Sequence, residues 1–242
     1  MLMNNNKGVA AKSLGVFRDK HADCIHCSIR NQMLFSEVPQ ELLGHLQNNI
    51  DDQKYPRHSE LYQQDEKGDF LFTIRRGLVK LVRELPNGTK RIVRLLRRGD
   101  VAGLEITLGH PYQHTAIALQ EADVCRIPMS VISYLSKDHP HLCHPLMERW
   151  QRGLDEADRF IVELSTGVAE MRFARLLIFL GESVTDRNCM SISREDMGAM
   201  LGITIETASR IMTDFKRRGL VKEISGTHCQ CDFEQLRRIA QG

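Results

Sequence analysis

The chain has 242 residues, of which 33 are lysine or arginine and 31 are aspartate or glutamate, so its formal net charge is only +2. This length accommodates two domains, and the near balance of charge excludes a polycation that coats nucleic acid through charge alone. No apolar run reaches the roughly 18–20 residues that a membrane span needs, and no signal peptide opens the chain. We therefore expect a cytoplasmic protein without a membrane partner, whose seven cysteines are reduced thiols.

A close pair of cysteines marks the polar N-terminal segment, residues 1–35. Cys24 and Cys27 form a C-x-x-C pair. Thiolates at this spacing can hold one metal ion or one iron–sulfur cluster. In a protein without disulfides, clustered cysteines indicate metal or redox chemistry, so we assign residues 1–35 to a sensor segment.

Short alternating strands separated by glycine turns follow in residues 36–138. FLFTIRRGLVKLVRE alternates apolar and polar residues around Arg76-Gly77, and Leu85-Pro86-Asn87-Gly88 is a strong turn signal. Several short strands at this spacing predict a small barrel or jelly roll. A cupin-like metalloenzyme is the alternative, but it needs two or three converging histidines plus a carboxylate. Residues 52–130 offer only three histidines and no H-x-H pair, so we expect no enzyme.

An apolar stripe with heptad-like spacing characterises residues 139–167. A helix of about 25 residues would be about 38 Å long, and its position between two domains favours a dimerisation helix. The alternative is a connector that packs on its own domains. The stripe consists of Leu146, Trp150, Leu154, Ala157, Ile161 and Leu164.

Two short helices joined by a glycine turn are predicted in residues 168–242. Ser193 and Asp196 form a start typical of a capping box, Gly202 is suited to the left-handed turn that ends a helix, and Thr204 is a good N-cap for the next helix. The paired helices predict a helix-turn-helix, which places its second helix in the DNA major groove. Residues 220–233 alternate around Ser225-Gly226 and add a β-hairpin, the wing of a winged variant.

The polar face of the second helix carries groups that can contact base edges. Glu206, Ser209 and Arg210 lie together at i, i+3 and i+4, with Thr204 and Thr213 as further candidates for DNA contact. Arginine can pair with guanine and a carboxylate can accept from cytosine, and each bidentate pair discriminates by roughly 1–3 kcal/mol. The alternative is an ordinary solvated face with a Glu–Arg pair.

Charge in the C-terminal part also favours a dimer. Residues 191–242 contain eight lysines and arginines against seven acidic residues, so one copy gains little from phosphate attraction.

Cys229 and Cys231 alternate on the predicted wing strand and share one face. They can form a C-x-C metal site, although packing is the commoner role, and Cys189 carries no signal of its own.

The order barrel, long helix and winged helix-turn-helix resembles the CRP/FNR family of bacterial regulators. The resemblance lies in GITIETASRIMTDFKRRGLV, RRGDVAGLEITLG, EADVCRIP and CIHCSIRNQ, and it is closest to the oxygen-responsive FNR branch. It implies an α+β protein with a cyclic-nucleotide-binding-like β-roll and a homodimer on a palindrome of the form TTGAT–four bases–ATCAA. It also implies that Glu206, Ser209 and Arg210 read double-stranded DNA and that the bound protein contacts RNA polymerase.

The resemblance also bears on the signal. Cyclic-AMP binders of the family carry an arginine before a Ser/Thr-Ala pair, whereas this chain has His114-Thr115-Ala116, so we expect no cyclic nucleotide. Cys125 lies where the FNR branch has its distant fourth cluster ligand, but Met33 replaces the third N-terminal cysteine.

Several interpretations of the sensor stay open. Cys24, Cys27 and Cys125 can hold a [4Fe-4S] cluster with a fourth ligand such as Asp23, His21, His26 or a small molecule. Alternatively the cysteines act as a thiol–disulfide switch, the sensor is a heme or another metal, or the protein binds DNA constitutively. If a cluster binds or the cysteines change redox state, the packing near Cys125 would change and so would the geometry of the dimer. Only one dimer geometry would place both Arg210 side chains in successive major grooves.

Overall fold

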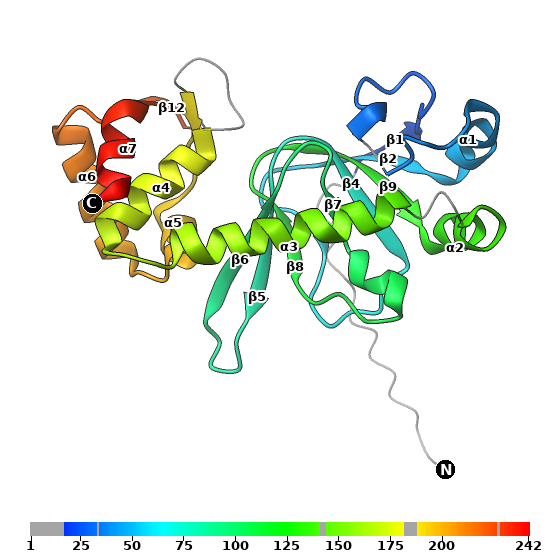
Figure 1. Ribbon diagram of the computed structural model, residues 1–242, viewed down its shortest axis with the longest axis horizontal. Helices are drawn as coiled ribbons and strands as arrows, with labels where there is room; N and C mark the ends of the chain where they lie inside the picture. Colours follow the sequence, from blue (N-terminus) through cyan, green and yellow to red (C-terminus); the bar gives the residue numbers. More distant parts are fainter. Residues whose placement is uncertain (1–16, 33, 141–143, 182–187, 227) are drawn as a thin grey trace, which may run out of the picture.

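The computed structural model describes residues 17–32, 34–140, 144–181, 188–226 and 228–242 (Figure 1). It has the α+β architecture that the sequence predicts: a β-roll, a long helix across it, and a C-terminal domain of helices with a small sheet. None of the described helices combines the length and the apolar character that crossing a membrane requires.

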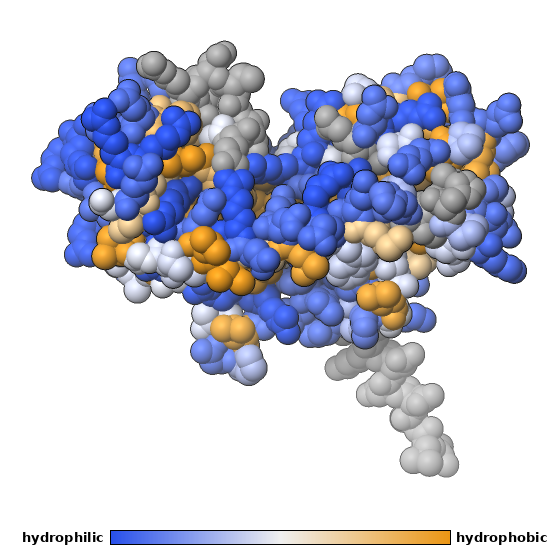
Figure 2. All heavy atoms as spheres, viewed as in Figure 1, coloured by the Kyte–Doolittle hydropathy of each residue, from blue (hydrophilic) through white to orange (hydrophobic). Residues whose placement is uncertain are grey.

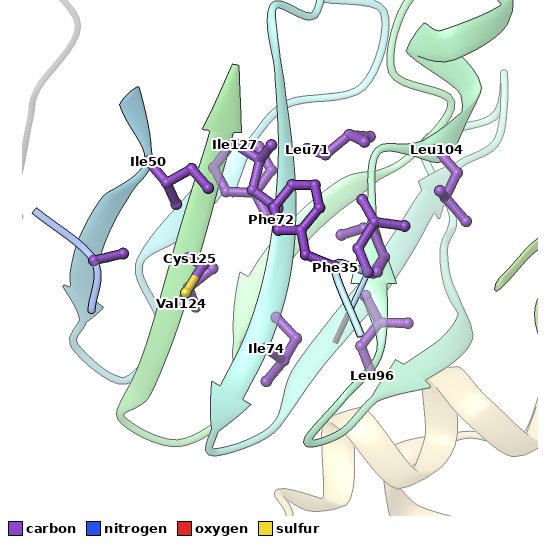
Figure 3. Close-up of a cluster of buried hydrophobic side chains, with 14 of the residues drawn as sticks. Phe35, Ile50, Leu71, Phe72, Ile74, Leu96, Leu104, Val124, Cys125 and Ile127 are labelled. Atoms are coloured by element: carbon purple, nitrogen blue, oxygen red, sulfur yellow. The ribbon is translucent and has the colours of Figure 1, made fainter. Parts of the chain in front are cut away.

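The β-roll is a sandwich of two antiparallel sheets. The first has the order β1-β2-β9-β4-β7 and the second β3-β8-β5-β6. Alternating side chains of both sheets meet in one apolar core, part of which Figure 3 shows around Phe72, Ile74 and Val124. The strands of the first sheet are β1 Phe17–His21, β2 Asp51–Tyr55, β9 Ala122–Pro128, β4 Phe70–Arg76 and β7 Val101–Ala102; those of the second are β3 Glu60–Tyr62, β8 Thr115–Ala118, β5 Val79–Glu84 and β6 Lys90–Leu96.

The segment between β1 and β2 adds a layer to the first sheet. It contains η1 (Arg30–Gln32), α1 (Gln40–Leu46) and η2 (Gln47–Asn49), and its apolar side chains join the core of the roll. The predicted sensor segment is thus continuous with the roll, because β1 is an edge strand of the same sheet. The 3-10 helix η3 (Leu104–Leu108) and helix α2 (Met129–Asp138) complete the domain.

Helix α3 spans His144–Leu164 and runs along the roll toward the C-terminal domain (Figure 1). The predicted apolar stripe divides into two groups. Leu164 is buried and Leu146 packs against the core of the roll. Trp150, Leu154 and Ile161 remain exposed, the last two by 59% and 61%. The stripe therefore serves both as an intrachain contact and as an uncovered apolar surface.

The C-terminal domain has its own core and packs on the roll. Leu78, Val82 and Ile92 of the roll belong to the same apolar cluster as α4 to α6. Lys80 Nζ lies 2.5 Å from Asp196 Oδ1, which joins β5 to α5. The elements are α4 Ala169–Gly181, β10 Asn188–Met190, α5 Arg194–Leu201, α6 Ile205–Arg217, β11 Val221–Ser225, β12 His228–Cys231 and α7 Phe233–Gln241, and the sheet order is β10-β12-β11.

Candidate nucleic-acid interface and thiol site

The turn between α5 and α6 forms as its residues predict. The Ser193 hydroxyl accepts a hydrogen bond from the Asp196 N–H at 3.0 Å and caps α5. Gly202 ends this helix with φ = 64°, a left-handed conformation that glycine adopts without strain. The Thr204 hydroxyl accepts from the Thr207 N–H at 3.2 Å and caps α6. The backbone of α5 at Gly198 lies very close to the Ile203 carbonyl oxygen, since a Cβ at this position would be only 2.7 Å from that oxygen. This close contact fixes the angle between α5 and α6.

Helix α6 buries one face and presents the predicted polar face outward. Its buried side chains are Ala208, Met212 and Phe215. The exposed side chains include Thr204, Glu206, Arg210 and Thr213, with Ser209 half-buried between them.

Hydrogen bonds orient the polar groups of this face, and its two charged side chains do not pair with each other. Hydrogen bonds from the Glu206 N–H and the Thr204 hydroxyl lower the pKa of the Glu206 carboxyl, which favours the ionised acceptor form. Thr213 donates its hydroxyl proton to the Ser209 carbonyl at 2.8 Å. Glu206 and Arg210 make no ion pair with each other among the described residues, so the i,i+4 pair of the alternative interpretation is not formed. Both charged groups remain available to a ligand.

Ion pairs around α6 hold its orientation. Arg218 bridges Glu170 of α4 at 2.6 Å and Asp214 of α6 at 3.2 Å. On the other side, Lys216 and Arg194 both contact the Glu223 carboxylate of the wing, at 2.7 and 3.1 Å. Exposed ion pairs of this kind stabilise by little individually. Together they connect α4, α5 and the wing to the helix that carries the polar face.

A second site arises where the N-terminal cysteines meet the first sheet. Cys125 on β9 lies directly opposite Asp52 of β2 and Thr73 of β4, so these three side chains point to the same face. Arg75, two residues beyond Thr73, forms an ion pair with Asp52 across the strand between them. Cys24 interacts electrostatically with Cys27, Arg75 and Asp52, which places the loop cysteines next to this face.

Burial governs the chemistry of these thiols. It raises the pKa of Cys24 to about 11, with a further contribution from neighbouring Cys27, and it also raises the pKa of Cys125; Arg75 opposes both shifts. Figure 3 shows the sulfur of Cys125 within the apolar core. Without a ligand, the Cys24 and Cys125 thiols are therefore protonated and unreactive, whereas a bound metal deprotonates its cysteine ligands.

Part of the donor set that an iron–sulfur group requires is present in this region. The Cys24, Cys27 and Cys125 thiols interact electrostatically, although their sulfur atoms do not all lie within 4.8 Å of one another. Arg75 offsets the negative charge of thiolates, and the buried Thr73 hydroxyl has no hydrogen-bond partner within the described part of the chain. Met33 and the side chain of His21 lie outside the described residues. Asp23 and His26 are exposed and pair with each other at 3.1 Å.

A pocket between the β-roll and α3 surrounds His114. Glu105 is buried and accepts a hydrogen bond from the Gln113 N–H at 2.9 Å, and His114 lies beside it. Burial lowers the pKa of His114, which favours the neutral imidazole. Arg94 and Arg149 line the same pocket. These two guanidinium groups were not predictable from the residues around His114, because they come from β6 and α3.

Comparison with known proteins identifies the two halves of the chain. Residues 52–139 match the model of the cyclic nucleotide-binding domain, and residues 171–239 match the Crp-like helix-turn-helix domain. The anaerobic regulatory protein of Aggregatibacter actinomycetemcomitans is 27% identical over 82% of this chain and 80% of its own length. The fumarate and nitrate reduction regulatory protein of Vibrio cholerae is also 27% identical, over 80% of each chain. The chain belongs to the CRP/FNR family, in its FNR-like branch.

The fold comparison agrees. The structure of FixK2 from Bradyrhizobium japonicum covers 78% of this regulator and 96% of its own chain, with a TM-score of 0.70 and 22% identity. The relatives are transcription regulators, which confirms the expectation of a DNA-binding regulator rather than an enzyme.

The structure adds partners to the thiol site that the sequence did not reveal. Asp52, Thr73 and Arg75 were missed, because which strands pair with β9 is not encoded locally. The only signal was alternation, which puts Thr73 and Arg75 on the same face of their strand. The predicted cysteines are near enough to interact electrostatically, and the predicted polar residues of α6 share its outward side.

Proposed function

We propose that this regulator acts as a homodimer that binds an FNR-type palindrome in response to oxygen or redox state. In this proposal, an iron–sulfur cluster held by Cys24, Cys27 and Cys125 carries the signal, and Glu206, Ser209 and Arg210 read the bases. The observation that carries it is the electrostatic proximity of the Cys24–Cys27 pair to Cys125, which lies about a hundred residues further along the chain. Beside a promoter, exposed loops of the roll would contact RNA polymerase, as the family resemblance implies.

The exposed surface of α3 supports the dimer. Leu154, Ile161 and Val162 are each exposed by about 60%, and Figure 2 shows apolar patches among hydrophilic atoms along the helix. A second copy would bury this surface in a helix–helix seam. Linking two half-site contacts then raises affinity by about 10²–10⁴-fold without any new contact.

The thiol face supports the redox-responsive group. A [4Fe-4S] cluster would supply iron chemistry that responds to oxygen. Cys24 and Cys125 are buried, so a group bound to them would be largely shielded from water. Arg75 supplies positive charge and Thr73 a hydroxyl. The fourth ligand would be a non-cysteine group, for which Asp23 and His26 are the adjacent candidates. A thiol–disulfide switch is less well supported, since such switches use accessible thiolates.

A short covalent path connects the thiol face to the dimer helix. Helix α2 begins at Met129, directly after β9, the strand of Cys125. Leu146 at the start of α3 packs against the core that includes Cys24 and Cys125. A change in packing around these cysteines therefore biases the position of α3. The coupling is reciprocal. If one arrangement of the thiol site favours dimerisation, dimerisation stabilises that same arrangement.

Anaerobic purification with iron and sulfide analysis tests the proposal. We expect about four iron and four sulfide ions per chain, visible absorbance, and binding to the palindrome that falls after exposure to air. Cys24→Ala should lose the iron and the oxygen response, whereas Cys143→Ala, which removes a cysteine outside both thiol groups, should retain both. A colourless wild-type protein without iron after anaerobic reconstitution would contradict the cluster. Equal promoter binding with and without air would contradict the redox response.

A further inference from the structure

Three buried cysteines converge behind the wing, far from the N-terminal thiol site. Cys189 lies on β10, and Cys229 and Cys231 lie on β12. Cys189 is directly opposite Cys229 in the antiparallel pair. Because side chains two residues apart on a strand share a face, Cys231 points to the same side as Cys229. Their side chains join the core of the C-terminal domain and are at most 2% exposed.

The sulfur atoms of Cys189, Cys229 and Cys231 lie closer together than ordinary van der Waals packing would place them. Cys189 and Cys229 are joined as a disulfide in the structure, so the expectation that all seven cysteines are reduced thiols is wrong for this pair, whose strands bring the two residues directly opposite each other. The Cys231 sulfur is 2.7 Å from that of Cys189 and 3.9 Å from that of Cys229. Non-bonded carbon atoms prefer separations of about 3.5–4.0 Å, and sulfur atoms are larger than carbon atoms. The disulfide explains why the sulfur atoms of Cys189 and Cys229 are close, but it does not explain why the sulfur atom of Cys231 lies so near to them. We propose that, in their reduced form, Cys189, Cys229 and Cys231 together bind a thiophilic metal ion.

Coordination geometry supports this assignment. A metal–sulfur distance of about 2.3 Å places two ligand sulfurs about 3.8–4.0 Å apart at tetrahedral or trigonal angles. The Cys229–Cys231 separation already has this value. Once a thiol reductant has converted the disulfide into two thiols, Cys189 completes a set of three. Binding of one ion then releases three protons, one from each thiol.

The surroundings define the class of ion. No fourth histidine, cysteine or carboxylate joins the group among the residues that the structure describes. Three soft thiolates favour copper(I), or zinc(II) with a small molecule as its fourth ligand. A surface hollow lined by Cys231, Lys222 and Arg237 provides an entry path with cationic side chains beside the negative tris-thiolate. The ion would clamp β10 to β12, and β11 of the same sheet packs on α6.

Metal titration in a background without the N-terminal site tests the inference independently of the iron–sulfur proposal. The parent is full-length protein with Cys24, Cys27 and Cys125 replaced by alanine, reduced with a phosphine that is then removed under anaerobic conditions. Cadmium(II) is the probe, because thiolate coordination gives an ultraviolet charge-transfer band. We expect one ion per chain, three protons released, and a higher melting temperature when the ion is bound.

Single variants identify the ligands. Cys231→Ala and Cys189→Ala should each weaken cadmium binding by at least about 100-fold, whereas Cys143→Ala should leave it unchanged. Circular dichroism checks that each variant is folded. Zinc and copper(I) competition then shows which ion binds more tightly; displacement of cadmium by either one supports the site. Unchanged binding in Cys231→Ala would overturn the proposal, as would a reduced parent that binds no cadmium.

Discussion

The ion pair between Lys80 and Asp196 connects the β-roll to the first helix of the helix-turn-helix, and it is largely removed from solvent. The two side chains are 15% and 7% exposed. Lys80→Met deletes the charge but keeps an unbranched chain of similar length. Removal of one partner from a buried pair costs about 3–5 kcal/mol, because the other charge is left uncompensated.

One contact of Asp196 and its position in α5 place the expected loss at the lower end of this range. Its carboxylate accepts a hydrogen bond from the Ser193 hydroxyl at 2.8 Å, and it lies in the first turn of α5, where the helix dipole favours a negative charge. We therefore expect Lys80→Met to lower the free energy of unfolding by about 3 kcal/mol. Asp196→Asn in the same chain should restore most of it, because the amide carries no charge.

Urea unfolding followed by circular dichroism measures these changes. The matched control is Arg238→Met, which breaks an ion pair whose side chains are 65% and 76% exposed and should cost at most about 1 kcal/mol. If Lys80→Met costs no more than this control, or if Asp196→Asn worsens the loss, the uncompensated buried charge is not the cause and the reasoning is wrong.

Three further changes test other parts of the structure. Gly198→Ala should destabilise by about 1–3 kcal/mol in urea unfolding, since its Cβ would meet the Ile203 carbonyl oxygen at 2.7 Å; an unchanged midpoint would contradict the tight turn. Burial raises the pKa of Glu156 to about 7, so the folded state binds the proton more tightly than the unfolded state. Stability should therefore fall as pH rises from about 4.5 to about 7, and Glu156→Gln should reduce that fall across a pH series; an identical fall would refute the shift. Leu154→Arg should give monomers in anaerobic sedimentation and weaken palindrome binding by about 100-fold or more, while Leu85→Arg on the roll should not; a persistent dimer would exclude the α3 seam.

Features set by neighbouring residues were predictable from the sequence. Ser193, Gly202 and Thr204 determine where α5 and α6 begin or end through contacts within a few positions. The outward face of α6 follows from helical periodicity alone. The β-roll was likewise indicated by alternation and glycine turns, because each strand and turn is specified by its own residues.

Features that depend on pairing between distant segments were not predictable. The register of β9 against β2 and β4 brings Thr73 and Asp52 beside Cys125. Cys189 carried no signal in the sequence, yet β10 places it opposite Cys229, 40 residues away. The docking of α5 on the roll joins Lys80 to Asp196 across 116 positions. No periodicity in either segment encodes such a contact.

The central claim is that the protein binds a palindrome as a dimer. In each subunit, the side chains of Glu206, Ser209 and Arg210 on α6 would contact the bases. Fluorescence anisotropy at one fixed salt concentration compares anaerobic wild-type protein on the palindrome and on a scrambled duplex. Arg210→Ala should reduce the ratio of the two affinities by about 5- to 150-fold per half-site, with little change on the scrambled duplex. Arg238→Ala, with the same loss of charge, should leave the ratio intact. An undiminished ratio in Arg210→Ala, or full-affinity binding by one subunit, would contradict the account.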